Sequence, residues 1–248
     1  MGQAADEPGT LDGLVNLYKP VGRSSAQYVY RLRPILGIRK VGHAGTLDPF
    51  ADGVLLACIG KATKLVERLM DLPKKYHTTL RLGVTNASFD TEHPFESFPN
   101  AVIPGRALVE AAAAALLGEI QQAPPAFSAM RVGGVFSYKL AKKGKAPELA
   151  ARPVRIYEIS VGRFEYPHLE LTISCGRGTY IRAIARDLGE SLGCGAVCED
   201  LTRLAVGPFT STQGIRLEST SPQTVRDSIL PIKTILELLE GSSSSDIR

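Results

Sequence analysis

The sequence predicts an α+β fold in which a mainly antiparallel, mixed central sheet is flanked by helices. Segments with a two-residue hydrophobic period, such as 169–175, and segments with a helical period, such as 180–192, follow one another without strict alternation. Strict alternation would favour a parallel sheet, so its absence favours antiparallel pairing. At 248 residues and 44% hydrophobic content, the chain can form one substantial domain, or a domain with a small appendage.

The expected elements follow a polar N-terminal segment, residues 1–12, which has no apolar periodicity and is expected to be a disordered tail. The main domain is expected over 13–214, with a short extension over 215–248. The sequence then predicts a strand over 13–18 that ends at Lys19-Pro20, and a helix capped by Ser24 or Ser25 that runs to about Arg33, where Pro34 interrupts it. A buried strand over 54–59 and an amphipathic helix over 62–70 follow. The last elements of the first half are a half-buried strand that starts at Tyr76 and a helix over 106–117 that stops at Gly118. Those predicted in the second half are an insertion over about 121–153 with one short helix around Tyr138, strands at about 154–164 and 169–175, a helix over 180–192, and a helix over 232–239 followed by a flexible serine-rich end from Gly241.

A loop with glycines at 42, 45 and 53 presents one carboxylate. It places Asp48 immediately before Pro49 and runs into the apolar strand that follows. Pro49 fixes its own φ and pushes the preceding residue out of the helical region, while the glycines permit a positive φ or a close backbone approach. The pattern indicates a tight loop that aims a catalytic aspartate, and an ordinary Asp-Pro turn is the alternative.

Positive charge is concentrated in two blocks of the sequence. Residues 19–81 carry 12 Lys and Arg against 4 Asp and Glu, and residues 131–155 carry 7 against 1, whereas the whole chain has a net charge of only +4. The remainder is therefore net acidic. A basic cluster set against an acidic remainder indicates a field directed toward a polyanion such as a nucleic acid, and solvated loop charge is the alternative for the second block.

Several classes of protein do not fit this composition. No apolar run approaches the roughly 18 residues that span a bilayer, and the polar, acidic N-terminus has no leader pattern, so no membrane association and a cytoplasmic location are expected. The four cysteines are too few for a disulfide scaffold, and Cys194 and Cys198 have neither zinc-knuckle spacing nor a nearby histidine, so buried free thiols and no metal are expected.

Two nucleotide- or sugar-directed interpretations also fail. The segment from Gly53 to Lys61 has too many residues between its glycines for a phosphate-binding loop, and Ala62 stands where that loop needs a hydroxyl. Asp48 and Asp52 as a glycosidase acid/base pair would lie on one turn without a sugar platform, and the chain has no tryptophan.

Six segments, in order, resemble the motifs of the TruB family of pseudouridine synthases. The resemblance covers roughly residues 14–209 and implies a pseudouridine-synthase fold whose insertion grips RNA. The segments that carry it are Leu17 to Ser25 (LYKPVGRSS), the Asp48 loop from Gly42 to Leu55, Lys75-Tyr76, Gln122 to Ala129 (QAPPAFSA) with Gly133 and Tyr138 after it, Gly178 to Arg182 (GTYIR), and Leu201 to Phe209.

The resemblance implies a role for individual side chains. Asp48 would be the nucleophile, Arg182 the cation that holds it ionised, and Tyr76 the ring that stacks on the base and assists loss of its proton. Taken from the residues alone, Arg182 could instead be a surface charge on a helix. The remaining implied substrate-binding residues are Lys19, His43 beside the flipped nucleotide, and Tyr180 and Leu201 as pocket walls, where a hydrogen-bonded loop histidine and plain core remain the alternatives for His43 and Leu201.

The insertion would hold the RNA backbone through Arg131, Lys142, Lys143 and Lys145. Two departures from the family pattern put RNA affinity in doubt more than activity: Met130-Arg131 stands where a lysine is usual, and Thr202 stands where an arginine commonly precedes Arg203. About 40 residues after Phe209 are fewer than the family's usual C-terminal RNA-binding module of the PUA type contains.

The resemblance implies an isomerase that converts the T-loop uridine at tRNA position 55 to pseudouridine after flipping it from its stack. The reaction is redox-neutral and loses no group, so no cofactor and no metal are expected. The expected partner is the tRNA T arm, and a monomer is expected. The alternative function is a non-catalytic, RNA-binding tRNA chaperone that uses the same basic surface.

Overall fold

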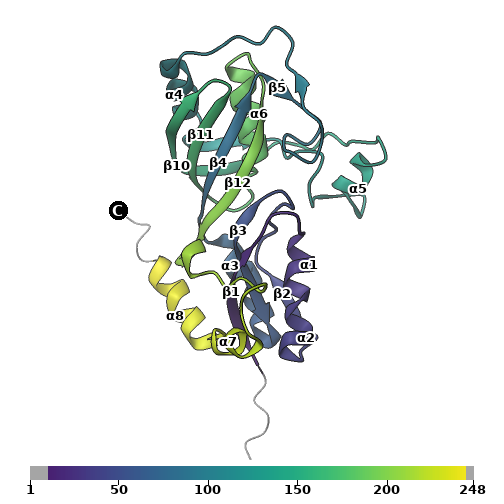
Figure 1. The fold of residues 1–248 in the computed structure, drawn as a ribbon, viewed down its shortest axis with the longest axis vertical. Helices are drawn as coiled ribbons and strands as arrows, with labels where there is room; N and C mark the ends of the chain where they lie inside the picture. Colours follow the sequence, from purple (N-terminus) through teal and green to yellow (C-terminus); the bar gives the residue numbers. More distant parts are fainter. Residues whose placement is uncertain (1–10, 244–248) are drawn as a thin grey trace, which may run out of the picture. The chain divides into compact units, whose positions relative to one another are not determined.

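The computed structural model describes residues 11–243, without the side chains of the last two. Contacts divide the chain into two compact units, which we describe separately (Figure 1). Unit 1 comprises the described residues up to Pro49, Gly53–Asp71, and those from Gly207 onward, and unit 2 comprises Phe50–Asp52 and Leu72–Val206.

Unit 1 is built on a small antiparallel sheet of order β14-β1-β3, in which β2 pairs with β3 as well. The register of β1 on β3 places Leu17 opposite Leu55. The elements of this unit are β1 (Gly13–Lys19), α1 (Ser25–Tyr30), α2 (Leu32–Leu36), β2 (Val41–His43), β3 (Asp52–Ile59, whose first residue belongs to unit 2), the 3₁₀ helix η1 (Gly60–Leu65), α3 (Val66–Asp71), β13 (Phe209–Thr210), the 3₁₀ helix η2 (Ser211–Gln213), α7 (Pro222–Asp227), β14 (Leu230–Pro231) and α8 (Ile232–Ser243).

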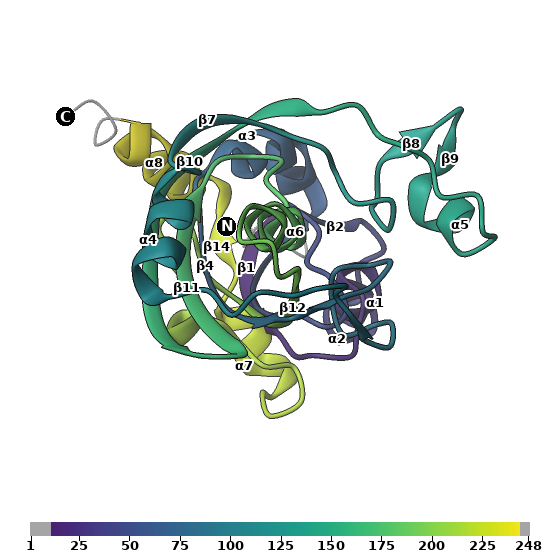
Figure 2. The same cartoon turned by 90° about the horizontal axis from the view of Figure 1, so that it is seen from above.

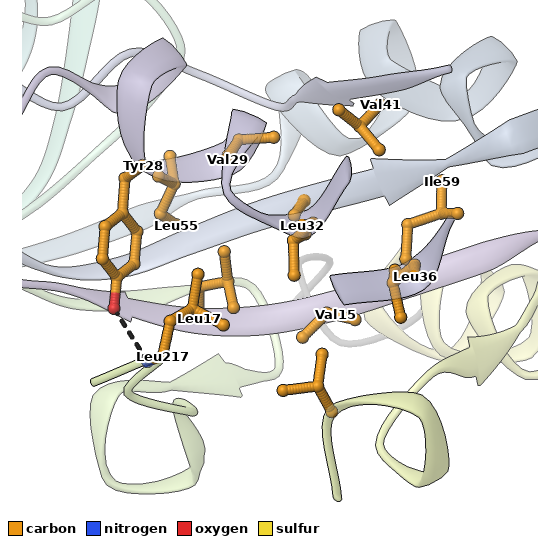
Figure 3. Close-up of a cluster of buried hydrophobic side chains, with 12 residues drawn as sticks. Val15, Leu17, Tyr28, Val29, Leu32, Leu36, Val41, Leu55, Ile59 and Leu217 are labelled. Atoms are coloured by element: carbon orange, nitrogen blue, oxygen red, sulfur yellow. Dashed lines mark hydrogen bonds between the residues drawn. The ribbon is translucent and has the colours of Figure 1, made fainter. Parts of the chain in front are cut away.

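The core of unit 1 forms where α1 and α2 cover this sheet (Figure 3). Buried aliphatic side chains from β1, β2 and β3 meet those of the two helices, and Tyr28 on α1 is buried among them. The Tyr28 hydroxyl accepts a hydrogen bond from the Leu217 N–H at 3.0 Å and donates to Glu218 at 2.9 Å. One buried phenol therefore fastens the segment that follows η2 to the N-terminal helices.

Unit 2 is built on an antiparallel sheet of order β12-β4-β11-β10-β7 that curves around α6 (Figure 2). Two short hairpins lie outside this sheet, and the one formed by β8 and β9 stands away from it together with α5. The elements of this unit are β4 (Lys74–Leu82), β5 (Val84–Thr85), β6 (Glu96–Ser97), α4 (Arg106–Ala114), β7 (Gly118–Gln122), β8 (Arg131–Val132), β9 (Val135–Phe136), α5 (Ser137–Ala141), β10 (Arg152–Glu165), β11 (His168–Cys175), α6 (Ile181–Ser191) and β12 (Ala196–Val206).

Alternation and helical periodicity position the centre of unit 2. Every second residue of β4 from Tyr76 is buried, and β11 buries Leu169, Leu171, Ile173 and Cys175 as its two-residue period predicts. Helix α6 is closely packed where Gly189 faces the start of β12, because a Cβ there would meet Ala196 N at 2.3 Å. Close approach of α6 to β12 therefore requires glycine at 189.

The predicted α+β class with mainly antiparallel pairing is confirmed, as are the strands over 13–18, 54–59, 154–164 and 169–175 and the helix over 180–192. The short helix predicted around Tyr138 is α5. The helix predicted from 232 does begin at Ile232, but it continues to Ser243 and so includes the first part of the serine-rich end that was expected to be flexible.

Several boundaries differ from the prediction. The first helix breaks at Arg31, and Pro34 lies inside the first turn of α2, where its missing N–H is not needed. The segment 62–70 begins as a 3₁₀ helix at Gly60. Helix α4 ends at Ala114, and Gly118 with φ 90° starts the unpredicted strand β7. Strand β12 was also not predicted.

Most of the predicted N-terminal tail lies outside the described residues. Its last residues, Leu11 and Asp12, are described, and the Asp12 carboxylate accepts a hydrogen bond from the Lys61 N–H at 2.6 Å. Among residues 11–243, no helix is long and apolar enough to cross a membrane.

Replacing Tyr28 by phenylalanine removes the hydroxyl between Leu217 and Glu218 and should lower the free energy of unfolding by about 1–3 kcal/mol, because a buried N–H loses its acceptor. Burial raises the pKa of Tyr28 to about 12. The stability that the neutral phenol contributes is therefore complete below about pH 10, the pKa in the unfolded chain, and is lost as the pH rises toward 12. Urea titrations between pH 7 and 11 measure both effects.

Tyr30→Phe is the matched control, because Tyr30 lies two residues away on the same helix and is 46% exposed. The control should unfold as the parent does. Equal stability of Tyr28→Phe and Tyr30→Phe would contradict the role given to the buried hydroxyl.

Candidate active site

Asp48 lies in a loop of unit 1 whose backbone is bonded to the start of α1. The Leu47 N–H donates to Ser25 Oγ at 2.8 Å, and the same hydroxyl donates to the Leu47 carbonyl at 2.8 Å. On the other side of Asp48, the Pro49 carbonyl accepts from the Gly22 N–H at 2.7 Å. The residues before and after the predicted nucleophile are therefore both held by the segment 22–25.

The glycines of this loop have different roles. Gly45 and Gly53 have φ of 93° and 106°, which side chains rarely adopt, as the sequence indicated. Gly42 lies within β2 opposite Cys58, so it serves as a strand residue. His43, the next residue of β2, is half-buried opposite Ala57.

Lys19 ends β1 as a fully buried cation, with 0% of its surface exposed. Its ammonium donates to the carbonyls of Pro20 and Arg23, both at 2.9 Å. These bonds close the Lys-Pro turn on itself, so Lys19 stabilises the turn that carries Gly22. The role in substrate binding that the family resemblance implies for Lys19 stays a prediction.

In unit 2, Arg182 occupies the first turn of α6 and is 3% exposed. Its guanidinium donates to the Ser88 carbonyl at 3.0 Å and to the Phe127 carbonyl at 2.9 Å, and it lies 3.3 Å from a carboxylate oxygen of Asp90. A surface charge is therefore excluded for Arg182, because the side chain is enclosed and joins three separate segments.

Asp90 is the centre of a buried polar network in unit 2. The carboxylate is 1% exposed, accepts from the Ser88 hydroxyl at 2.5 Å and from the Glu92 N–H at 2.9 Å, and faces Arg182. The Ser88 hydroxyl in turn lies 2.9 Å from His93 Nδ1. Phe89, which lies between Ser88 and Asp90 in the sequence, has φ 56°, a strained value for a bulky residue and one that often marks a functional site.

Tyr180, the N-cap residue of α6, is held by the buried side chain of Gln122. The Tyr180 N–H donates to Gln122 Oε1 at 2.8 Å, and Gln122 Nε2 donates to the Tyr180 carbonyl at 3.2 Å. The Tyr180 ring lies 5.5 Å from the guanidinium of Arg152. The backbone two residues before Arg182 is thereby fixed to the end of β7.

Tyr76 and Leu201 lie on adjacent strands of the unit 2 sheet. Tyr76 on β4 is opposite Arg203 on β12, and Leu201 is opposite Thr78, so all four side chains belong to one face. All of them are buried. The sheet therefore places Tyr76 and Leu201 on the same surface.

The predicted RNA-gripping residues lie on an exposed part of unit 2. Lys142, Lys143 and Lys145 follow α5 and are exposed. Arg131 on β8 is exposed as well, with its guanidinium 4.3 Å from the centre of the Phe136 ring. Phe136 stacks on Tyr138 with their ring centres 5.7 Å apart. Basic and aromatic side chains thus share one projecting segment.

Each unit carries its own set of predicted site residues. Unit 1 holds Asp48, His43 and Lys19, and unit 2 holds Tyr76, Tyr180, Arg182 and Leu201. The ion pair between Asp48 and Arg182 joins residues of different units and stays a prediction.

Sequence reasoning missed Asp90, Ser25 and Gln122. The density of polar residues from Asn86 to His93 was the available signal for Asp90, and the polar residue at the start of a family-like motif was the signal for Gln122. For Ser25, the signal was obscured by its neighbour, because either serine fitted the helix cap. The structure assigns the cap to Ser24, whose hydroxyl accepts from the Gln27 N–H.

The cysteines behave as buried thiols, as predicted. All four are free and buried, and burial raises the pKa of Cys58 to about 12 and that of Cys175 to about 11. Within the described part of the chain, no group of three or more His, Cys, Asp or Glu residues is placed to hold a metal ion.

Two family models match nearly the whole described chain. The model of the TruB family pseudouridylate synthase N-terminal domain matches residues 33–181, and that of the tRNA pseudouridylate synthase B C-terminal domain matches residues 182–237. The chain belongs to the TruB family. The division between the two models falls at Arg182. His43, Asp48, Tyr76 and Tyr180 lie within the N-terminal match, Arg182 and Leu201 lie within the C-terminal match, and Lys19 precedes both.

Relatives in this family are similar over most of their length. The chain is 39% identical to tRNA pseudouridine synthase B of Clostridium novyi over 90% of this chain and 76% of the relative. It is 44% identical to tRNA pseudouridine synthase B of Arthrobacter sp. over 84% of this chain and 70% of the relative.

Solved structures share the fold of this chain. The chain aligns with one chain of a Cbf5–Nop10–Gar1 complex with a TM-score of 0.69 at 27% identity, covering 91% of this chain and 62% of that one. An H/ACA RNP bound to a substrate RNA containing 2′-deoxyuridine gives a TM-score of 0.66 at 25% identity, covering 92% of this chain and 62% of that one. The TruB family chain thus has a pseudouridine-synthase fold.

Asp90→Asn should lower the free energy of unfolding by about 3 kcal/mol, because it removes the charge of a buried carboxylate that pairs with the enclosed guanidinium of Arg182. Glu165→Gln breaks a fully exposed pair with Arg163 in the same unit and should leave the stability unchanged. Chemical denaturation measures both variants. Equal stability of the two would contradict the assignment of Asp90 as the structural partner of Arg182.

Proposed function

We propose that this protein is a tRNA pseudouridine(55) synthase: it isomerises the T-loop uridine at tRNA position 55 to pseudouridine, as a monomer and without a cofactor. The observation that carries the proposal is the Asp48 loop, a carboxylate held between two anchored residues in a member of the TruB family. The names of the relatives, each a tRNA pseudouridine synthase B, supply the substrate class.

The reaction breaks the bond from the ribose C1′ to the base N1, turns the base, and joins C1′ to the base C5. The hydrogen at C5 leaves as a proton and N1 gains one, so no electron acceptor and no second substrate are needed. A carboxylate nucleophile opens a covalent path by attacking the sugar or the base and leaving again at the end. Asp48 takes this role.

Three further groups serve the chemistry in this proposal. Arg182 favours the ionised form of Asp48, since an opposite charge close to a carboxylate stabilises it. Tyr76 stacks on the extruded base and assists removal of the C5 proton. His43 occupies the space that the uridine leaves in its stack, which offsets part of the few kcal/mol that flipping costs. Tyr180 and Leu201 line the pocket.

RNA binding is assigned to the projecting segment around α5. Exposed Arg131, Lys142, Lys143 and Lys145 neutralise phosphates, and the neighbouring aromatic pair of Phe136 and Tyr138 offers ring faces for unpaired bases. Such a surface suits a stem with an exposed loop, which is the form of a tRNA T arm.

A tRNA chaperone without catalysis is the alternative. It would need the phosphate contacts but neither an anchored carboxylate nor a buried arginine network. Ser25 and Gly22 hold the backbone beside Asp48, and Asp90 pairs with Arg182. These fixed positions favour the enzyme.

The test is to incubate the protein with an unmodified tRNA transcript and to map pseudouridine by base-resolved chemistry. The proposal expects modification at position 55. RNA binding with faster tRNA refolding but no modified base would instead support the chaperone.

Asp48→Asn should abolish pseudouridine formation while RNA affinity and thermal stability remain those of the parent, because binding rests on basic residues elsewhere. Single-turnover rates with saturating protein measure the effect. Asp71→Asn, an exposed carboxylate at the end of α3, is the control and should keep the parent rate. Retention of about a tenth of the parent rate by Asp48→Asn would rule out a nucleophile, since loss of one typically costs far more.

Replacing Lys142, Lys143 and Lys145 together by alanine should weaken RNA binding and reduce the slope of log affinity against log salt by roughly 0.7 to 0.9 for each phosphate that the variant no longer neutralises. The rate at saturating protein should change less than the affinity. Lys233→Ala removes an exposed lysine on α8 and should leave the slope as it is. An unchanged slope in the triple variant would show that RNA is held elsewhere.

A further inference from the structure

We propose that Ser25 is a positioning residue for Asp48. Its hydroxyl forms hydrogen bonds with both the N–H and the C=O of Leu47 and so sets the direction of the nucleophilic carboxylate. The inference rests on the proposed function of Asp48. It assigns to Ser25 no contact with the substrate.

The geometry is specific to a hydroxyl group. Ser25 Oγ accepts from the Leu47 N–H and donates to the Leu47 carbonyl, each at 2.8 Å. A hydroxyl is both donor and acceptor, so one atom satisfies two backbone groups of the same residue. Ser25 and Leu47 are 1% and 3% exposed, so water does not replace the hydroxyl. Without it, a buried N–H and a buried C=O are left unpaired.

The same segment also holds the other side of Asp48. The Gly22 N–H donates to the Pro49 carbonyl at 2.7 Å, and Pro49 fixes its own φ and restricts the preceding residue. The turn that presents Gly22 is closed by the buried ammonium of Lys19. The turn from Lys19 to Ser25 thus forms a template on which both neighbours of Asp48 are fixed.

The neighbouring serine separates this role from helix capping. Ser24 accepts from the Gln27 N–H as the N-cap of α1, and the Ser24 N–H donates to Gln27 Oε1. Ser25 has no part in that cap, and its hydroxyl lies on the Asp48 loop. The two hydroxyls therefore have different tasks although they are adjacent in the sequence.

A nucleophile must stay close to its attack position, and a small displacement reduces the rate without weakening substrate binding. Ser25→Ala should therefore lower the single-turnover rate roughly ten- to a hundredfold at saturating protein, with the dissociation constant for tRNA unchanged within error. Amide exchange of the peptide 44–50 should become faster, which reports the loss of the Leu47 bond independently of activity. Ser25→Cys, which keeps a weaker donor and acceptor of similar size, should have an intermediate rate.

Ser24→Ala is the matched control: it removes a hydroxyl one residue away and destabilises the start of α1, but it should keep the parent rate and the parent exchange of 44–50. A parent-like rate in Ser25→Ala, or an equal loss of rate in Ser24→Ala, would overturn the proposal. Should Ser25→Ala not fold, Ser25→Cys decides, and a parent-like rate in that variant overturns the proposal too. A parent protein that forms no pseudouridine would refute the proposed function instead, while the exchange of 44–50 would still judge the Ser25 bond.

Discussion

A buried positive charge must be fully bonded, and the guanidinium of Arg182 imposes this constraint on the centre of unit 2. It satisfies the requirement with the carbonyls of Ser88 and Phe127 and with the carboxylate of Asp90. These acceptors lie on two segments away from α6, so meeting the charge brings the loop 86–93, the segment before the insertion hairpin and the start of α6 together. A charged group that is costly to bury therefore organises the residues around it.

Each unit holds a residue of the proposed site by fixing the backbone beside it. Ser25 forms hydrogen bonds with the N–H and the C=O of Leu47, the residue before Asp48. Gln122 forms hydrogen bonds with the N–H and the C=O of Tyr180, two residues before Arg182. In each case a short polar side chain replaces the ladder of hydrogen bonds that a strand or helix would provide. Such bonds restrict the backbone beside a side chain that lies outside a regular ladder, which suits the orienting roles proposed for Asp48 and Arg182.

Elements whose hydrophobic residues repeat with a single period could be predicted from the sequence. Strands that depend on pairing with a neighbouring strand could not. Strand β11 and helix α6 have a single buried face each, so alternation and helical spacing identified them. In β12, register shifts between Cys198 and Asp200 and between Arg203 and Ala205 break the two-residue period. Strand β7 contains one apolar residue besides its first glycine, Ile120, and exists because it pairs with β10.

The candidate site differs in the same way. Asp48, Tyr76 and Arg182 could be proposed from the sequence because they lie in segments that resemble motifs of the family. Asp90 was missed because its partner Arg182 lies far along the sequence, and their contact follows from tertiary structure alone.

The proposed reaction moves one glycosidic bond of one tRNA uridine from nitrogen to carbon. Because the new bond forms at C5, every isomerisation releases the hydrogen held there, so tRNA transcribed with [5-³H]uridine reports the reaction as tritium in water. We expect one equivalent of tritium to be released per tRNA, and none from a tRNA whose position 55 is cytidine. No release from the parent tRNA, or equal release from the cytidine variant, would contradict this reaction.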